Sequence, residues 1–212
     1  MSRITNFILD VDGTIWDTTE VVAKAWNRAI ETDGHSKTRV DAGRLKTLFG
    51  KPMNVIAENL FTDVTPEIRE KLLNDCCREE QQDLSECTKV LMYPYVKETI
   101  KKLYEKECQL FIVSNCQTGY IELVLEKNGL TEYIKDFECF GNTGKQKSEN
   151  IRSICDRNGL NMSETVYVGD TLGDYEAAGK AGCPFVYADY GFGRVPDTKV
   201  QISSFRELLC LS

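Results

Sequence analysis

The sequence has a single histidine, His35, and no Cys-x-x-Cys pair among its nine cysteines. A structural zinc site needs several cysteine or histidine ligands at short spacings, so the sequence gives no support for one. The cysteines are odd in number and scattered through segments of regular pattern, which does not fit a disulfide framework. We therefore expect free, mostly buried thiols and a reducing, cytoplasmic setting.

Long apolar runs and basic clusters are also absent. No run reaches the roughly 20 residues needed to cross a bilayer, and residues 1–10 lack the pattern of a secretory signal. The formal net charge is −7, with lysine and arginine spread along the 212 residues. We expect a globular protein with no membrane or nucleic-acid partner, present as a monomer or weak homodimer.

Short, nearly continuous apolar runs recur along the chain and predict strands that are buried on both faces of a sheet. These runs are Phe7–Leu9, Leu110–Val113, Phe137–Phe140, Val166–Val168 and Pro184–Tyr187. Helical patterns separate the later runs, two of them ending at Asn-Gly pairs and a short one ending at Gly182. The alternation of strand and helix predicts βαβ units and therefore an α/β fold with a doubly wound parallel sheet.

The interval after the first apolar run is almost wholly helical in pattern. Its first helix is amphipathic and has Thr18 or Thr19 as a suitable N-cap. The next strand-like run begins only near residue 110. We therefore expect an α/β core made of residues 1–15 and 88–212, with residues 16–87 inserted as a separate α-helical domain.

Polar residues directly follow three of the apolar runs. Asp10 follows the first, with Asp12 two residues later, while Ser114-Asn115 and Asp170 lie at the ends of two others. Residues i and i+2 of an extended chain point to the same side. Because ligands of open α/β sheets bind beyond the carboxyl ends of the strands, these side chains are expected to meet. The Asp-Gly step could also form a hairpin, but the following residues lead into a helix.

Four short motifs resemble, in order and spacing, those of the haloacid dehalogenase-like superfamily, most of whose members are aspartate-nucleophile phosphatases. DVDGT at 10–14 is similar to the first motif and VSN at 113–115 to the second. A lysine at 145 or 147 is similar to the third, and GDTLGD at 169–174 to the fourth. The chain is most similar to the phosphoglycolate-phosphatase-like branch. The resemblance implies a Rossmann-like core, an α-helical cap and a Mg²⁺-dependent phosphatase.

The resemblance also implies a role for each acidic residue. Asp10 is the nucleophile that forms an aspartyl-phosphate with a small phosphomonoester, and Asp12 is the general acid and base. Mg²⁺ prefers oxygen ligands, which the Asp10 and Asp170 carboxylates and the Asp12 backbone carbonyl supply. Asp174 contributes from outside the first coordination sphere, and an exchange of roles between Asp170 and Asp174 stays open.

The same resemblance implies a set of phosphate-binding residues. The Ser114 hydroxyl and the Asn115 backbone N–H hold a phosphoryl oxygen, together with Thr14 of the first motif. A lysine offsets the charge that develops in the transition state. Lys147 stands directly before a helix-start signal and is preferred for this role, with Lys145 as the alternative.

Substrate choice is expected to depend on the helical cap. Lys51 lies in a Gly-Lys-Pro loop between two expected cap helices and could meet a substrate carboxylate or a second phosphate. Phosphoglycolate, a sugar phosphate, a nucleotide and pyrophosphate all remain open as substrates.

Related activities are distinguished mainly by Asp12. Dehalogenases lack this second acid, and phosphonatase-like enzymes carry alanine in its place. A β-phosphoglucomutase-like phosphotransferase needs a histidine shortly after the first motif, but residues 17–26 contain none. A non-catalytic phosphate-binding protein similar to a response-regulator receiver has neither the helical insert nor the second acid. The phosphatase is therefore preferred, with the mutase and the phosphate sensor as alternatives.

Overall fold

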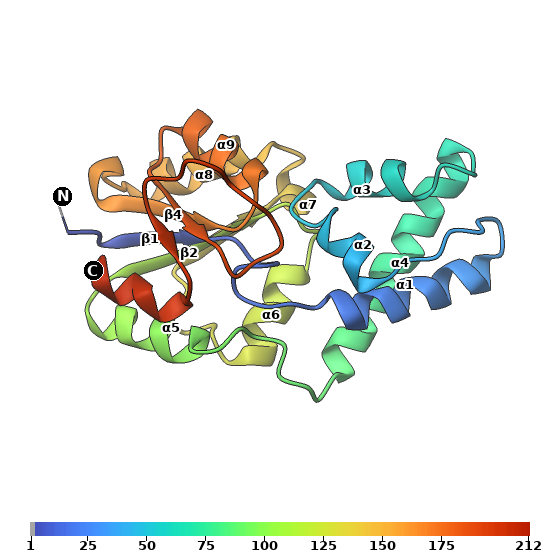
Figure 1. The fold of residues 1–212 in the computed structure, drawn as a ribbon, viewed down its shortest axis with the longest axis horizontal. Coiled ribbons are helices and arrows are strands. Elements are labelled where there is room, and N and C mark those ends of the chain that lie inside the picture. The colour runs from blue at the N-terminus through green and yellow to red at the C-terminus, as the bar shows by residue number, and fades with distance from the viewer. Residues whose placement is uncertain (1–2) are drawn as a thin grey trace.

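The computed structural model describes residues 3–212. Within them lies one six-stranded sheet in the order β3-β2-β1-β4-β5-β6, with every neighbouring pair parallel (Figure 1). Its strands are β1 (Asn6–Leu9), β2 (Gln109–Ser114), β3 (Asp136–Cys139), β4 (Thr165–Gly169), β5 (Phe185–Ala188) and β6 (Gln201–Ile202). Because β1 has β2 on one side and β4 on the other, the sheet is doubly wound, as predicted from the sequence.

Helices cover both faces of the sheet (Figure 1). One face carries α8 (Lys147–Asn158) and α9 (Leu172–Ala181); the other carries α5 (Val96–Glu105), α6 (Tyr120–Asn128) and the 3₁₀ helix η2 (Phe205–Cys210). Neighbouring strand residues belong to different apolar clusters, Ile8 to the first face and Leu9 to the second. Successive strand residues point to opposite faces, so strands covered on both sides need continuous apolar sequence.

Helices inserted between β1 and α5 form the second part of the molecule. They are α1 (Thr19–Asp33), α2 (Ala42–Lys46), α3 (Met53–Leu60) and α4 (Pro66–Glu86). α1 and α3 pack against α4, and α2 packs against α1 (Figure 1). Their buried residues join those of one sheet face in a single apolar cluster. The fold is therefore an α/β core with an α-helical cap.

The start of α1 shows how local residues define an element that leads into the site. The helix begins at Thr19, and Thr18 occupies the N-cap position without a side-chain cap bond. Asp17 takes over the capping role, because its Oδ1 accepts hydrogen bonds from the Thr19 backbone N–H at 3.0 Å and the Thr19 hydroxyl at 2.6 Å. The Thr18 hydroxyl is thereby free to contact the site.

The structure differs from the sequence-based expectation at several element ends. β3 stops at Cys139, and Phe140 opens the short helix α7 (Phe140–Thr143) instead of closing the strand. β5 begins after Pro184, because proline lacks the N–H that a strand donates to its neighbour. The two-residue strand β6 and the 3₁₀ helices η1 (Met162–Glu164) and η2 were not predicted, since such short elements leave no periodic pattern.

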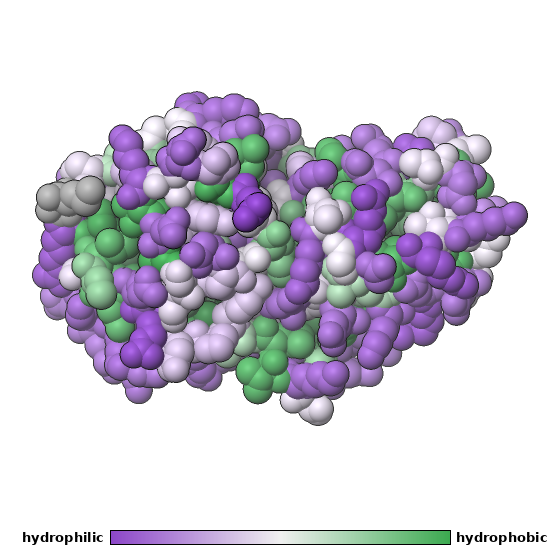
Figure 2. Space-filling model, in the orientation of Figure 1, coloured by the Kyte–Doolittle hydropathy of each residue, from purple (hydrophilic) through white to green (hydrophobic). Residues whose placement is uncertain are grey.

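The surface and the thiols agree with the composition. No helix within residues 3–212 combines the length and the apolarity of a membrane span. The face of the molecule in Figure 2 is largely hydrophilic, with small apolar areas between polar ones. All nine cysteines are free, and six of them are buried as small apolar side chains.

Candidate active site

Three adjacent strand ends place polar side chains at one edge of the sheet. Asp10 directly follows β1, Ser114 ends β2, and Asp170 directly follows β4. β1 pairs with both of the other strands, and the Asp10 backbone N–H extends this pairing with a 2.9 Å hydrogen bond to the Val168 carbonyl. Strands β2 and β3 lie on one side of β1 and strands β4 to β6 lie on the other, so the direction of the strand order reverses at β1. Ligands of doubly wound sheets bind at this point of reversal.

Lys147 forms two buried ion pairs at this edge of the sheet. It is the first residue of α8, whose start is stabilised by a capping box. Its Nζ lies 2.9 Å from Asp10 Oδ1 and 2.6 Å from Asp174 Oδ1, and the three side chains are 4%, 1% and 0% exposed. Lys145 is exposed. The fold therefore brings Lys147, and not Lys145, to Asp10.

The three carboxylates differ in how many of their oxygens accept hydrogen bonds. Asp174 Oδ1 accepts from Lys147, and Asp174 Oδ2 accepts from the Thr171 N–H at 3.0 Å and hydroxyl at 2.6 Å, in the capping box of α9. Asp10 Oδ2 and Asp170 Oδ1 are buried and have no hydrogen-bond partner among residues 3–212. Two carboxylate oxygens thus remain available at the strand ends, while those of Asp174 are engaged.

The donor set fits a magnesium ion. One carboxylate oxygen from each of Asp10, Asp170 and Asp174 lies within 4.8 Å of the others. Unpaired buried carboxylate oxygens are costly, and a hard cation that prefers oxygen ligands would satisfy them. Glycine keeps this space open, because a Cβ at Gly13 or Gly191 would collide with the Asp170 carboxylate. Asp10 and Asp170 offer the free oxygens, whereas Asp174 is placed to position the lysine.

Burial and neighbouring charges set the ionisation of these groups. Burial raises the pKa of Asp10 and of Asp170, and the Lys147 ammonium opposes the rise at Asp10. Burial alone would lower the pKa of Lys147, but the carboxylates of Asp10 and Asp174 raise it above its ordinary value. The lysine consequently stays charged beside the acid that it contacts.

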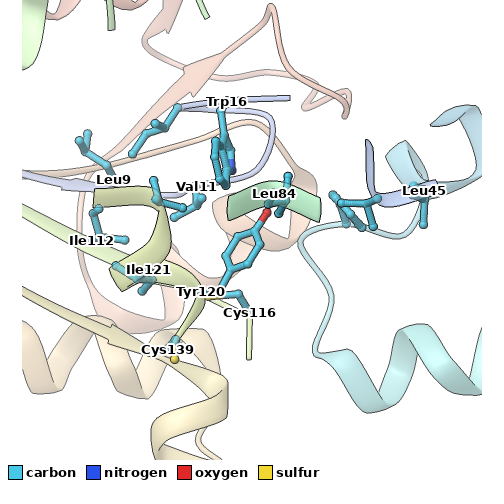
Figure 3. Packing of buried hydrophobic residues seen from close by; sticks show 14 of the residues in the cluster. Leu9, Val11, Trp16, Leu45, Leu84, Ile112, Cys116, Tyr120, Ile121 and Cys139 are labelled. Atoms are coloured by element: carbon cyan, nitrogen blue, oxygen red, sulfur yellow. The ribbon is translucent and has the colours of Figure 1, made fainter. Parts of the chain in front are cut away.

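Asp12 is held by a tyrosine that the sequence analysis did not identify. Its Oδ1 accepts hydrogen bonds from the Tyr120 hydroxyl at 2.7 Å and from the Thr18 hydroxyl at 3.4 Å. Tyr120 packs edge-on against Trp16, with ring centroids 5.7 Å apart, in the buried cluster that reaches α4 at Leu84 (Figure 3). In the sequence, Tyr120 looks like an ordinary apolar position of a helix.

The environment of Asp12 favours its protonated form. Burial raises the pKa of Asp12 to about 8, while the hydrogen bond from Tyr120 acts in the opposite direction. At neutral pH this carboxyl group can therefore donate a proton.

A narrow cavity of about 20 Å³ lies beside Asp10 and Asp12. Ser114 and Asn115 line it from the core, and Lys51, whose side chain is exposed, lines it from the loop between α2 and α3. The Asn115 side-chain amide donates to the backbone carbonyl of the neighbouring Gly50 at 2.8 Å. This bond holds the loop of the helical part against the core.

Thr14 does not line the cavity, unlike the expected phosphate-binding residues Ser114, Asn115 and Lys51. It is buried and is not one of the cavity-lining residues. Its hydroxyl has no hydrogen-bond partner in the described part of the chain, while its backbone carbonyl accepts from the Tyr190 hydroxyl at 2.9 Å.

A second polar group in the cavity wall was also missed from sequence. Glu80 of α4 is only 3% exposed and lines the cavity together with Trp26 and Gln117. The Trp26 indole N–H donates to Glu80 Oε2 at 2.7 Å, and the Gln117 amide donates to Glu80 Oε1 at 3.2 Å. Glu80 lies in the charged segment REEQQD, which gives no sequence signal that one of its acids is buried.

Comparisons with known proteins agree with this geometry. The family model of the haloacid dehalogenase-like hydrolases matches residues 7–188. A phosphoglycolate phosphatase of Vibrio parahaemolyticus is 26% identical over 195 residues, covering 86% of this chain and 82% of that protein. One from Aliivibrio fischeri is 25% identical over 215 residues, with coverage of 95% and 93%.

A solved structure shows the same fold. The crystal structure of a predicted phosphoglycolate phosphatase from Haemophilus somnus aligns with a TM-score of 0.87 at 20% identity, covering 100% of this chain and 99% of that one. The family predicted from the four motifs is thereby confirmed. The chain belongs to the haloacid dehalogenase-like hydrolases.

Proposed function

We propose that this phosphatase hydrolyses a small phosphomonoester through a covalent phosphate on Asp10, with Asp12 as general acid and base. The main support is the arrangement of Asp10 itself. One of its oxygens is fixed 2.9 Å from Lys147, and the other is buried without a partner. Asp10 and Asp12 line the same cavity, so a nucleophile and a proton donor are available to one substrate.

In the first step, the Asp10 carboxylate attacks phosphorus and the bond from phosphorus to the alcohol oxygen breaks. Asp12 gives its proton to the departing oxygen, as its raised pKa favours. Ser114 and Asn115 hold a phosphoryl oxygen, and the Lys147 ammonium offsets the negative charge. When bound by Asp10 and Asp170, Mg²⁺ supplies the positive charge that lets a phosphate dianion approach a carboxylate.

In the second step, Asp12 is ionised and acts as a base. It removes a proton from a water molecule that attacks the phosphorus of the aspartyl-phosphate. The bond between phosphorus and the Asp10 oxygen breaks, which releases inorganic phosphate and restores both carboxyl groups. One residue thus serves as acid and then as base, and the substrate alcohol leaves between the two steps.

We assign the cap role to residues 16–87 and the core role to residues 1–15 and 88–212. The Gly50 loop of the helical part contacts the core at Asn115, where it can exclude bulk water during the reaction. Lys51 in the same loop is placed to contact the substrate. Phosphoglycolate is the substrate named for the curated relatives, and it is one candidate among small phosphomonoesters.

The phosphatase is preferred to the mutase because no histidine contacts Asp12. His35 is exposed and bonds to Asp33 at 3.0 Å, whereas Asp12 is held by Tyr120.

Replacing the nucleophile should abolish turnover. We expect Asp10→Asn to lose metal-dependent phosphate release from every phosphomonoester tested, because an amide cannot form the aspartyl-phosphate. A metal chelator should abolish phosphate release by the wild-type protein, and added Mg²⁺ should restore it. Phosphate release would be followed in a coupled assay, and circular dichroism would show that the variant is folded. Substantial turnover by Asp10→Asn would contradict its assignment as the nucleophile.

The two lysines of the third motif form a matched pair for mutation. We expect Lys147→Met to lower kcat by about a hundredfold or more, since it removes a charge aimed at the reacting group. Lys145→Met removes the same charge from an exposed position and should leave kcat near the wild-type value. Steady-state kinetics on both variants checks this. Similar losses in the two variants would show that Lys147 has no special role.

Tyr120→Phe should change the pH dependence of the reaction. Loss of the hydroxyl removes a hydrogen bond that stabilises ionised Asp12, so the pKa of Asp12 should rise. Because the first step uses the protonated form, activity should persist to higher pH. The alkaline limb of kcat/KM against pH would be compared with that of wild type and of Tyr175→Phe, an exposed control. An unchanged limb, or a shift to lower pH, would oppose this role for Tyr120.

A further inference from the structure

Glu80 adds a buried carboxylate to the wall of the cavity beside Asp10 and Asp12. It comes from the helical insert, on α4, and lines the same cavity as Asp10 and Asp12. Its charge is close enough to raise the pKa of both Asp12 and Tyr120. For a substrate held in this cavity with its phosphate at Asp10, the alcohol portion would border the remaining lining, which includes Glu80.

The bonding of Glu80 leaves room for a ligand. Its partners are neutral donors, the Trp26 indole and the Gln117 amide, one on each oxygen. Within residues 3–212, no basic side chain forms an ion pair with it. A carboxylate can accept about four hydrogen bonds, and a buried one without a cation is costly. A hydrogen-bond donor on the substrate would give the Glu80 carboxylate a further partner that the protein does not provide.

The other residues of the cavity wall also bear on which substrates fit. Phe49, Met53 and Ile56 offer an apolar surface to a short carbon chain, and Lys51 is the one basic side chain of the lining. Lys51 is exposed, whereas Glu80 is buried. Burial raises the pKa of Glu80 to about 7, and the hydrogen bonds from Trp26 and Gln117 oppose the rise. An ammonium group beside Glu80 favours its ionised form, and interactions between charges are stronger away from water, so Glu80 then sets the sign of the wall at depth. A second carboxylate beside it would be repelled.

We infer that Glu80 makes this site select phosphomonoesters whose alcohol portion carries a hydrogen-bond donor, an ammonium or a hydroxyl group, over carboxylated ones such as phosphoglycolate. This selectivity rests on the proposed function. Glu80 accepts the donor group, while Trp26 and Gln117 fix the carboxylate in place. The chain accordingly differs in substrate from the curated relatives that are named for phosphoglycolate.

The test compares substrates that differ in the group beyond the phosphate. Phosphoethanolamine supplies an ammonium, glycerol 3-phosphate supplies hydroxyls and phosphoglycolate supplies a carboxylate, with p-nitrophenyl phosphate as the general reference. Wild type should give its lowest kcat/KM with phosphoglycolate. Glu80→Gln, an isosteric change, should lower the ratio of phosphoethanolamine to phosphoglycolate by about tenfold or more, since it removes a charged hydrogen bond.

The variant also separates the two donor classes. Glutamine still accepts a hydrogen bond, so a preference for glycerol 3-phosphate should survive Glu80→Gln, while a preference for phosphoethanolamine should not. Glu79→Gln is the matched control, because it removes the same charge from the preceding residue, which is partly exposed and paired with Arg28. Its substrate ratios should equal those of wild type.

Two results would overturn the inference. One is a wild-type protein that hydrolyses phosphoglycolate at least as well as the donor-bearing substrates, a result that needs no folded variant. The other is an unchanged set of ratios in folded Glu80→Gln. A failure of the proposed function itself would give a different result. The wild-type protein would then show no metal-dependent phosphate release, even from p-nitrophenyl phosphate.

Discussion

The contact of Lys147 with Asp10 and Asp174 is the interaction on which the site depends. It joins the end of β1 to the first turns of α8 and α9. Three charges excluded from water are stable there only if they are paired in good geometry. The pairing fixes one oxygen of Asp10, while the other is buried without a hydrogen-bond partner among residues 3–212. The orientation of Asp10, the proposed nucleophile, thus follows from one buried ion-pair cluster.

A second constraint connects the helical insert to the core. Glu80 of α4 is bonded to Trp26 of α1 and to Gln117, which follows the site residue Asn115. Buried polar groups need all their partners, so such a network favours one arrangement of the elements that it joins. The same arrangement brings α4 to the buried cluster of Tyr120 (Figure 3). The insert therefore helps to form the cavity wall as well as to cover it.

The sheet edge could be predicted from sequence because its signals are local. Apolar runs end in Asp10, Ser114 and Asp170, and the carboxyl ends of parallel strands meet at one edge. Tyr120 and Glu80 could not be predicted in this way. A helical pattern indicates which face of a helix is buried, but not which partner that face meets. Tyr120 reaches Asp12 only because α6 packs on the sheet, and Glu80 is buried only because α4 packs against α1.

The central claim is that phosphate passes through a covalent bond to Asp10. Asp12→Asn should slow hydrolysis of this bond, because the base that activates water is lost, and it should also slow formation of the bond, because the acid is lost. With p-nitrophenyl phosphate, whose leaving group departs without a proton, formation is affected least and the intermediate should accumulate. The protein would be mixed with substrate and Mg²⁺, quenched in acid and digested for peptide mass spectrometry. The account predicts the added mass of one phosphoryl group on the peptide that contains Asp10, located at that residue. Phosphate release with no phosphoryl group on the protein at any time, or with the group on another residue, would contradict it.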